Sequence, residues 1–152
     1  MNTNSWNETW GTIDWCHDFE EDVMEKIDVF YLSGVDMNMQ NEYGLTPLML
    51  AADYGRRNLV DMLASFDANV NAQNKHGSTA LHYAVWHGYA DVVKVLIDAE
   101  ANPNIRNSDG NRAIDLTYDQ RIRNIILRAI PQPIVILSEE DTPASVFDRQ
   151  YE

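Results

Sequence analysis

The chain has 152 residues, enough for one domain, and its net charge of −13 opposes binding to the phosphate backbone of DNA or RNA. No apolar run reaches the roughly 18–20 residues that cross a bilayer, and the polar N-terminus lacks the apolar core of a secretory signal, so neither a membrane span nor export is expected. A single cysteine, Cys16, excludes an internal disulfide framework and favours the reducing cytoplasm, with the nucleus as the alternative.

Acidic residues are concentrated at the two ends of the chain. Residues 1–40 contain nine acids and one base, for a charge of −8, and residues 131–152 contain five acids and one base, for −4. The residues between them are close to neutral. Two explanations follow: the acidic ends keep an open repeat stack in solution, or they attract a basic partner protein.

The start of the chain is predicted to be a flexible segment followed by a degenerate structural unit. Residues 1–7 are polar and are expected to be flexible. Residues 8–40 align, at a spacing of 33, with clearer units that follow, so that Gly11 corresponds to Gly44. Trp15 then takes a core position, and the acidic run after it supplies the polar outer face that a terminal unit presents to water. We therefore expect this unit to cap a stack.

Residues 41–73 and 74–106 are two copies of one unit. The equivalent positions, 33 residues apart, are Gly44 and Gly77, Thr46 and Thr79, Leu48 and Leu81, Gly55 and Gly88, and Leu63 and Leu96. Each copy places a turn before a short apolar helix, and a second apolar helix follows. A fixed period of this length indicates a solenoid of stacked units.

The same period continues into residues 107–130, which are predicted to form a second degenerate cap. Gly110 keeps the frame, and isoleucines recur on one stripe of the last helix. Pro131 ends that helix. Residues 131–152 follow as an acidic tail. The apolar run at 134–137 is expected to pack on the last unit or on a partner, because it would promote aggregation if it were free.

One position at the end of each second helix differs among the units. Gly34 stands where the two central units have Asp67 and Glu100. Glycine adopts a positive φ without strain, whereas a side chain makes that conformation costly. We expect a left-handed backbone at all three residues, with strain at the two that carry side chains.

Two motifs in the central units are specific because several positions recur together and in order. They are Gly44-Leu45-Thr46-Pro47-Leu48 with Ala51-Ala52, and Gly77-Ser78-Thr79-Ala80-Leu81-His82 with Ala84. These motifs resemble ankyrin repeats. The resemblance implies an all-α solenoid of helix-turn-helix units with β-turn or hairpin fingers, which spans residues 8–130. Thr46 and Thr79 would then cap the first helices, with Pro47 at the first helical position.

No arrangement of residues in the sequence points to catalysis, a cofactor or a metal. There is no phosphate-binding glycine loop, paired Cys-x-x-Cys or His-Glu-x-x-His motif. Cys16 and His17 are adjacent, so on a helix their side chains diverge by about 100° and do not form a nucleophile–base pair. His82 is expected to bond to neighbouring turn groups. We therefore predict a protein that is not an enzyme.

The resemblance also predicts a binding surface. In ankyrin-like stacks, the turn tips and the exposed ends of the first helices line a concave groove. By that correspondence the predicted partner contacts are Trp10, Glu42, Tyr43, Leu45, Asp53, Tyr54, Lys75, His76, Trp86, His87, Asp109 and Asn111. Aromatic side chains of this kind often dominate the binding energy of an interface.

The leading functional hypothesis is a protein–protein interaction module that binds a partner protein through this groove. The alternative is an acidic inhibitor or immunity-type protein that blocks a basic, nucleic-acid-processing enzyme. Salt separates the two hypotheses, because a charge-driven inhibitor weakens steeply with ionic strength and an aromatic groove does not. In both cases the partner is another protein, a basic one in the second, and neither nucleic acid nor a membrane is expected.

Overall fold

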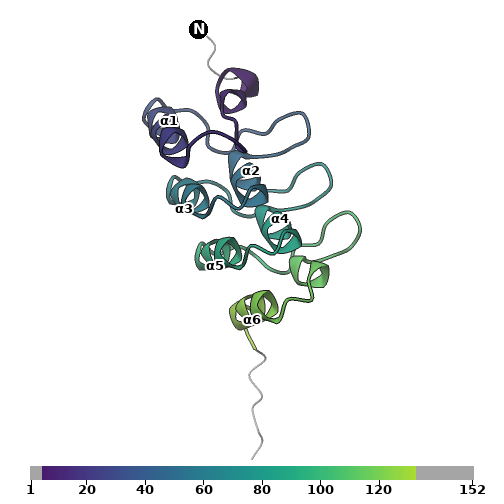
Figure 1. Ribbon diagram of the computed structural model, residues 1–152. Helices are drawn as coiled ribbons and strands as arrows, with labels where there is room; N and C mark the ends of the chain where they lie inside the picture. Colours follow the sequence, from purple (N-terminus) through teal and green to yellow (C-terminus); the bar gives the residue numbers. More distant parts are fainter. Residues whose placement is uncertain (1–4, 133–152) are drawn as a thin grey trace, which may run out of the picture.

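Helices stacked in two columns make up the computed structural model, which describes residues 5–132 (Figure 1). The elements are the 3₁₀ helices η1 (Trp6–Glu8), η2 (Trp10–Thr12) and η3 (Ala113–Leu116), and the α-helices α1 (Glu20–Leu32), α2 (Pro47–Asp53), α3 (Arg57–Ser65), α4 (Ala80–Trp86), α5 (Ala90–Asp98) and α6 (Gln120–Ala129). Helices α1, α3, α5 and α6 form one column and α2 and α4 lie in the other, with loops projecting beyond the second column (Figure 1). The described residues contain no β-strand, and the predicted all-α solenoid is confirmed.

Threonine hydroxyls start the inner helices α2 and α4, as predicted. The Thr46 Oγ1 atom accepts a hydrogen bond from the Met49 backbone N–H at 3.2 Å, and Pro47 occupies the first helical turn. In α4, Thr79 Oγ1 accepts from the His82 backbone N–H at 3.4 Å, while His82 Nδ1 accepts from the Thr79 N–H at 3.1 Å. Each cap pairs N–H groups that a helix start otherwise leaves free, and so fixes where the helix begins.

Apolar residues at equivalent positions of successive repeats form one continuous core. Leu48 of α2 and Leu81 of α4 are each 1 % exposed, and Leu63 and Leu96 of the outer helices are fully buried. Ala52 is also fully buried, and its small side chain lets α2 approach α3 closely. Burying one leucine side chain stabilises the fold by about 1.5–3 kcal/mol, so these shared positions hold successive layers together.

The loops before α2, α4 and η3, called fingers here, are bonded to one another. The three fingers are residues 40–45, 73–78 and 106–111. The Lys75 N–H donates to the Tyr43 carbonyl at 3.2 Å, and the Ser108 N–H donates to the His76 carbonyl at 2.9 Å. In each finger an asparagine side chain accepts from the N–H groups two and four residues ahead, at Asn41, Asn74 and Asn107. These bonds align the finger tips at the repeat spacing.

The position that follows each of α1, α3 and α5 has a left-handed backbone, and this prediction is confirmed. The angle φ is +76° at Gly34, +61° at Asp67 and +66° at Glu100. The alignment of Gly11 with Gly44 does not extend to the backbone: φ is +76° at Gly44, whereas Gly11 lies in η2 and is not among the residues of positive φ. The N-terminal unit therefore lacks a finger of the repeat type.

The N-terminal unit departs from the repeat pattern in its aromatic content. It has η1 and η2 in place of an inner α-helix, and η1 begins at Trp6, inside the range expected to be flexible. Trp10 is fully buried; its ring meets the edge of Phe30 at a centroid distance of 5.2 Å and stacks on Trp15 at 6.4 Å. Its Nε1–H donates to the Asp36 carbonyl at 3.2 Å. The prediction of Trp10 as a partner contact is therefore wrong, because its indole fills the end of the core.

Helix α6 closes the other end of the stack. Ile122 and Ile126 are fully buried, and α6 packs against α5. The Arg123 Nη1 atom donates to the Ile114 carbonyl at 3.0 Å and to the Thr117 carbonyl at 3.2 Å, which ties α6 to η3. The last inner segment is thus a short 3₁₀ helix held by an arginine rather than a capped α-helix.

The predicted acidic tail begins at Pro131, after α6 has ended at Ala129. The apolar run at 134–137 lies outside the described residues. The packing of that run, and the boundary of the repeats at residue 130, therefore stay predictions.

Candidate functional site

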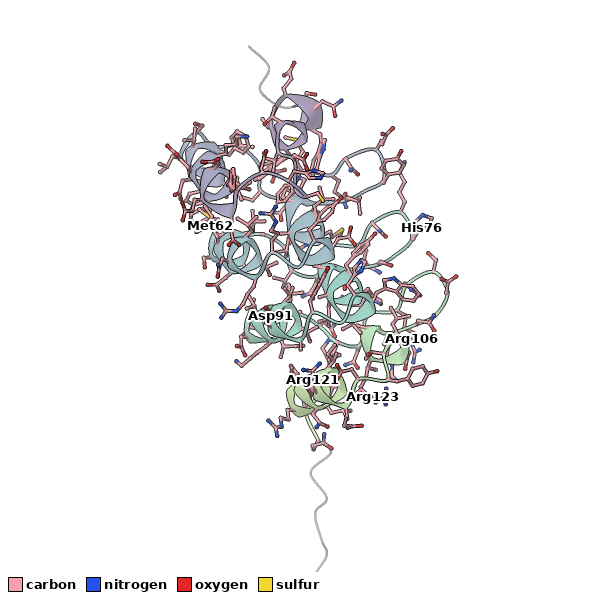
Figure 2. All side chains as sticks on the ribbon, in the orientation of Figure 1. Met62, His76, Asp91, Arg106, Arg121 and Arg123 are labelled. Carbon is pink, nitrogen blue, oxygen red and sulfur yellow. The ribbon has the colours of Figure 1, made fainter. Side chains whose placement is uncertain are left out.

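A groove of about 460 Å³ opens between the ends of the inner helices and the fingers, where three successive repeats meet. Its lining residues are Asp53, Asn74, His76, Ser78, His82, Tyr83, Trp86, His87, Asn107, Asp109, Asn111 and Leu116. Figure 2 shows His76 on the finger side of the molecule, away from Met62 and Asp91 on the outer helices. Clefts of about 300–1,000 Å³ hold ligands, so the groove has room for a side chain of a partner.

Trp86 presents the largest side chain of the groove, and 68 % of it is exposed. It is the last residue of α4, and the two residues before it, Ala84 and Val85, are buried. His87 is the C-cap of the helix, and Gly88 follows with a φ of +78°. Because the core-facing positions of this turn are already filled, the indole lies at the groove. A tryptophan exposed inside a hollow is the kind of side chain that often anchors an interface.

A histidine–aspartate pair forms one wall of the groove. The His87 Nε2–H donates to Asp53 Oδ1 at 2.7 Å, which joins the ends of α4 and α2. The His87 ring also stacks on Tyr89 at a centroid distance of 5.5 Å. The second Asp53 oxygen, Oδ2, has no hydrogen-bond partner within residues 5–132. One carboxylate oxygen therefore orients His87, and the other remains able to accept a bond.

Asn74 and Tyr83 form a polar floor. The Asn74 Nδ2 atom donates to Tyr83 Oη at 2.8 Å, and Asn74 is 8 % exposed. Burial, and to a smaller extent the charge of Asp53, raises the pKa of Tyr83 above its ordinary value. The phenol is therefore neutral near pH 7 and keeps its proton as a donor. Because Asn74 Oδ1 also holds its own finger together, the floor is fixed before any partner arrives.

His82 lies at the base of the groove and is bonded through both ring nitrogens. Its Nδ1 atom accepts from the Thr79 N–H at 3.1 Å, and its Nε2–H donates to the Asn111 carbonyl at 2.9 Å. Burial lowers the pKa of His82 below the ordinary value, so the ring is neutral near pH 7, as these bonds require. The predicted structural role of His82 is confirmed: it joins α4 to the third finger.

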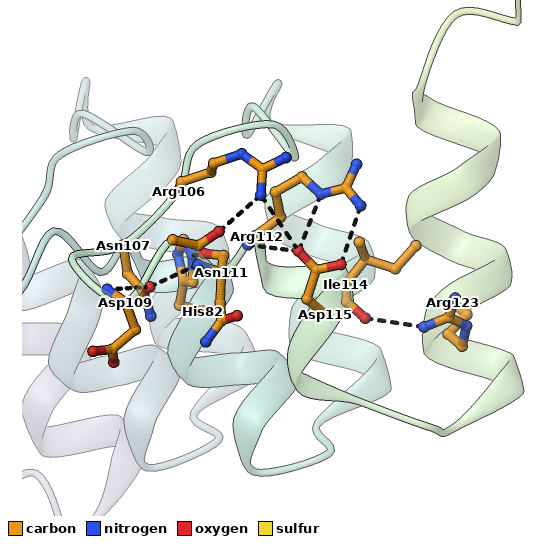
Figure 3. Close-up of polar contacts among 10 residues, drawn as sticks. His82, Arg106, Asn107, Asp109, Asn111, Arg112, Ile114, Asp115 and Arg123 are labelled. Carbon is orange, nitrogen blue, oxygen red and sulfur yellow. Dashed lines mark hydrogen bonds and ion pairs between the residues drawn. The ribbon is translucent and has the colours of Figure 1, made fainter.

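A cluster of two arginines and one aspartate lies beside the groove at the third finger (Figure 3). Arg112 donates to Asp115 through Nε and Nη2, both at 3.1 Å, and Arg106 Nη1 is 4.0 Å from the same carboxylate. The bonds from Arg112 lower the pKa of Asp115 below its ordinary value. Figure 3 shows the Asp109 carboxylate pointing away from this cluster. Asp115 thus pairs with Arg112, Arg106 donates mainly to the Gly110 carbonyl at 2.7 Å, and neither arginine pairs with Asp109.

The groove contains half of the predicted partner contacts. Those in its lining are Asp53, His76, Trp86, His87, Asp109 and Asn111. Glu42, Tyr43, Leu45, Tyr54 and Lys75 lie outside the lining, and Trp10 is in the core. Tyr43 and Tyr54 are 62 % and 44 % exposed, but the groove does not unite them with Trp86, and Leu45 packs partly against the core.

Sequence reasoning missed most of the groove floor. Asn74, Tyr83, Asn107 and Leu116 line the groove without having been predicted as contacts. Tyr83 precedes Trp86 by three residues, and this spacing places both side chains on one face of α4. Asn74 and Asn107 are 33 residues apart and hold equivalent places in two fingers. Helical spacing and the repeat period are therefore the signals from which this floor could be found.

The groove does not have the geometry of a metal centre. Across residues 5–132, no three histidine, cysteine, aspartate or glutamate side chains are grouped to hold a metal ion. His17 is 3.0 Å from Asp14 through Nδ1, and its neighbour Cys16 is exposed. In the same part of the chain, no helix combines the length and the apolar character that a membrane crossing requires.

Comparisons with known proteins match the chain to repeats of one kind. A family model described as "Ankyrin repeats (3 copies)" matches residues 20–107, more than half of the chain. Among solved structures, the crystal structure of the ankyrin repeat domain of Bcl-3, a member of the IkappaB protein family, superposes with a TM-score of 0.67 and 28 % sequence identity. The match covers 71 % of this chain and 47 % of that one, so the chain spans about half of that relative. No curated protein gives a significant match.

Proposed function

The chain belongs to the ankyrin-repeat family, and we propose that it is a non-enzymatic module that binds a partner protein through the groove at Trp86. One observation carries this proposal: an indole that is 68 % exposed in a groove built by three successive repeats. Family membership and the likeness to an IkappaB-family domain support protein–protein interaction in general. The exposed indole in the groove supports this groove as the proposed place of binding.

The indole of Trp86 is expected to contribute most of the binding energy. Roughly 150 Å² of exposed ring surface at about 25 cal/mol per Å² corresponds to about 3–4 kcal/mol when a partner covers it. The walls need little ordering on binding, because His87 is held by Asp53 and the floor by Asn74. Truncation of such an aromatic anchor commonly costs about 2 kcal/mol or more, which is roughly a thirtyfold loss of affinity.

The test compares the full chain with its Trp86→Ala variant as baits for proteins of a cell extract. A protein retained by the parent and lost from Trp86→Ala is purified, and its Kd for both chains is measured by isothermal titration calorimetry. We expect a loss of about thirtyfold in affinity. Tyr118→Ala is the control, because Tyr118 is 100 % exposed and lies outside the groove, and it should leave the Kd unchanged. Circular dichroism melting of both variants checks that folding is intact.

An acidic inhibitor remains the second candidate, because of one feature of α1. Its first turn carries three acids in succession, Glu20, Glu21 and Asp22, on a chain of net charge −13. Under this candidate, neutralising the three acids to Gln, Gln and Asn would weaken binding, and the Kd of the parent would rise steeply with salt. Equal affinity of the parent and Trp86→Ala for the purified partner, together with that salt dependence, would contradict the groove and favour the acidic cap.

A further inference from the structure

The charge in the groove has one sign. Its lining contains two carboxylates, Asp53 and Asp109, and neither lysine nor arginine. Beside the third finger, Arg112 pairs with Asp115, and Arg106 donates to the Gly110 carbonyl. The histidines of the lining include His82, whose buried ring is neutral near pH 7. A hollow with two carboxylates and no lysine or arginine favours a cation over an anion.

Both groove carboxylates retain bonding capacity. The Asp109 backbone N–H donates to Asn107 Oδ1 at 3.0 Å, which fixes the residue on the finger. Its carboxylate has no hydrogen bond or ion pair in the described part of the chain, and it points away from the arginine cluster (Figure 3). Asp53 uses Oδ1 for the 2.7 Å bond from His87, and its Oδ2 is unbonded there. Each wall therefore offers a carboxylate oxygen to the N–H donors of a partner.

The exposed indole of Trp86 suits the same kind of group. Tryptophan is the aromatic side chain that attracts a cation most strongly to its face. A guanidinium group is planar and can stack on such a face while its N–H groups donate to carboxylates at its edge. An ammonium group lacks that planar fork. The combination of one indole with two carboxylates thus favours arginine over lysine.

Apolar and acidic side chains fit the groove less well. An apolar side chain would cover Asp53, His87 and the Tyr83 hydroxyl without replacing their bonds to water, and each unreplaced bond is unfavourable. An acidic side chain would meet two carboxylates of the same sign. Neither could use the free oxygens of the walls.

We propose that the groove takes an arginine side chain of the partner protein, stacked on Trp86 and bonded by Asp53 and Asp109. This inference rests on the proposed function, since it names the side chain that the proposed binding groove receives.

The test uses the isotope-labelled full chain and N-acetyl-arginine-methylamide as the probe, followed by two-dimensional NMR. The matched control is N-acetyl-citrulline-methylamide, which has nearly the same shape and no charge. The arginine probe should shift the indole N–H signal of Trp86 and the backbone amide of Asp109, and saturate with a Kd on the order of 1 mM, as expected for a single side chain. The citrulline probe should give no saturable shift of these signals over the same range.

Variants show how much the indole and a carboxylate each contribute to the affinity for the arginine probe. Asp109→Asn should weaken the arginine probe by about two- to fivefold, as for one partly exposed ion pair. Trp86→Ala should weaken it by about three- to thirtyfold, as for one cation–π contact. Asp61→Asn removes the same charge from the exposed surface of α3, outside the groove, and should leave the Kd unchanged.

Equal shifts with arginine and citrulline, an absence of shifts at Trp86, or an unchanged Kd in Asp109→Asn would each overturn the arginine proposal. Failure of the proposed function is a separate outcome. The groove itself fails as the site when Trp86→Ala binds the purified partner as tightly as the parent. The arginine proposal alone fails when Trp86→Ala weakens that partner and Asp109→Asn does not.

Discussion

The N-terminal unit and the repeat at 74–106 are layers of the same stack, but different interactions hold each of them in place. In the repeat, Thr79 and His82 cap a short inner helix, and His82 reaches on to the next finger. The N-terminal unit packs Trp10 against Trp15 and Phe30 at the corresponding place. An internal layer must satisfy backbone groups of two neighbours, whereas a terminal layer has one neighbour and can be closed by aromatic bulk. Repeat motifs are therefore informative inside the stack and weak at its ends.

The two tryptophans Trp10 and Trp86 differ in burial because one lies in the terminal unit and the other in an internal repeat. Trp10 is fully buried, and Trp86 is 68 % exposed. Trp10 belongs to a layer with two 3₁₀ helices in place of an inner α-helix, and its ring fills the core there. Trp86 ends a complete helix whose core positions are filled by smaller residues.

The largest expected effect separates these two tryptophans. Trp10→Ala removes a buried indole and should lower the free energy of unfolding by about 3–5 kcal/mol. Trp86→Ala should change it by less than about 0.5 kcal/mol, because the side chain is mostly in water. Urea denaturation followed by circular dichroism measures both. Equal losses in the two variants would show that Trp86 supports the core and would remove it as a free anchor.

A second effect contrasts an internal glycine with a terminal one. Gly44 and Gly34 both have a φ of +76°, but a Cβ atom at Gly44 would lie 2.9 Å from the Lys75 nitrogen, whereas nothing lies within 4 Å at Gly34. Gly44→Ala should therefore cost about 2–4 kcal/mol, from backbone strain and displacement of the next finger. Gly34→Ala should cost about 1–2 kcal/mol, from strain alone. Thermal melting of the two variants tests whether the contact with the next finger adds to the cost of backbone strain. Similar decreases in melting temperature would show that it does not.

A third effect concerns the histidine that distinguishes the two central repeats. His82 occupies the position of Met49, 33 residues earlier. His82→Met should destabilise the protein by about 1–3 kcal/mol, because the Thr79 N–H and the Asn111 carbonyl each lose a partner. Met49→Leu, a substitution of similar volume, is the control and should cost less than about 1.5 kcal/mol.

The same histidine should make stability depend on pH. Burial holds the folded-state pKa of His82 below the ordinary value of 6.5, so the unfolded chain takes up a proton first as pH falls. The contribution of the neutral ring is therefore complete above pH 6.5 and is lost as pH falls from there through the folded-state pKa. Urea denaturation across this range should show a smaller loss in His82→Met than in the parent. Identical pH profiles would contradict a buried neutral ring.

The smallest expected effect is a gain in the free energy of unfolding. Asp67 and Glu100 have φ values of +61° and +66° at the position where the N-terminal unit has Gly34. Asp67→Gly or Glu100→Gly should raise the free energy of unfolding by roughly 0.5–1 kcal/mol, because glycine relieves the strain of the left-handed backbone. Clearly lower melting temperatures in both variants would show that these side chains contribute more than the strain costs.

Local and repeated signals let the sequence by itself determine the period, the fold class and the backbone at several turns. Thr46 and Thr79 cap helices through atoms three residues ahead, and Gly34, Asp67 and Glu100 take a conformation set by the end of a helix. Such features depend on neighbours in the chain, and the period of 33 aligns them from unit to unit. His82 could be assigned a structural role for the same reason.

The tertiary structure alone decided which side chains share the groove and which aromatic is free. The bond between His87 and Asp53 joins residues 34 apart, and the exposure of Trp10 or Trp86 depends on what the adjacent layer covers. Neither follows from a motif, because side-chain burial is set by packing across layers and the terminal layers break the pattern that the motif describes. The physical reason is that the sequence of a repeat determines the backbone of its own unit, whereas the groove is lined by side chains of several units.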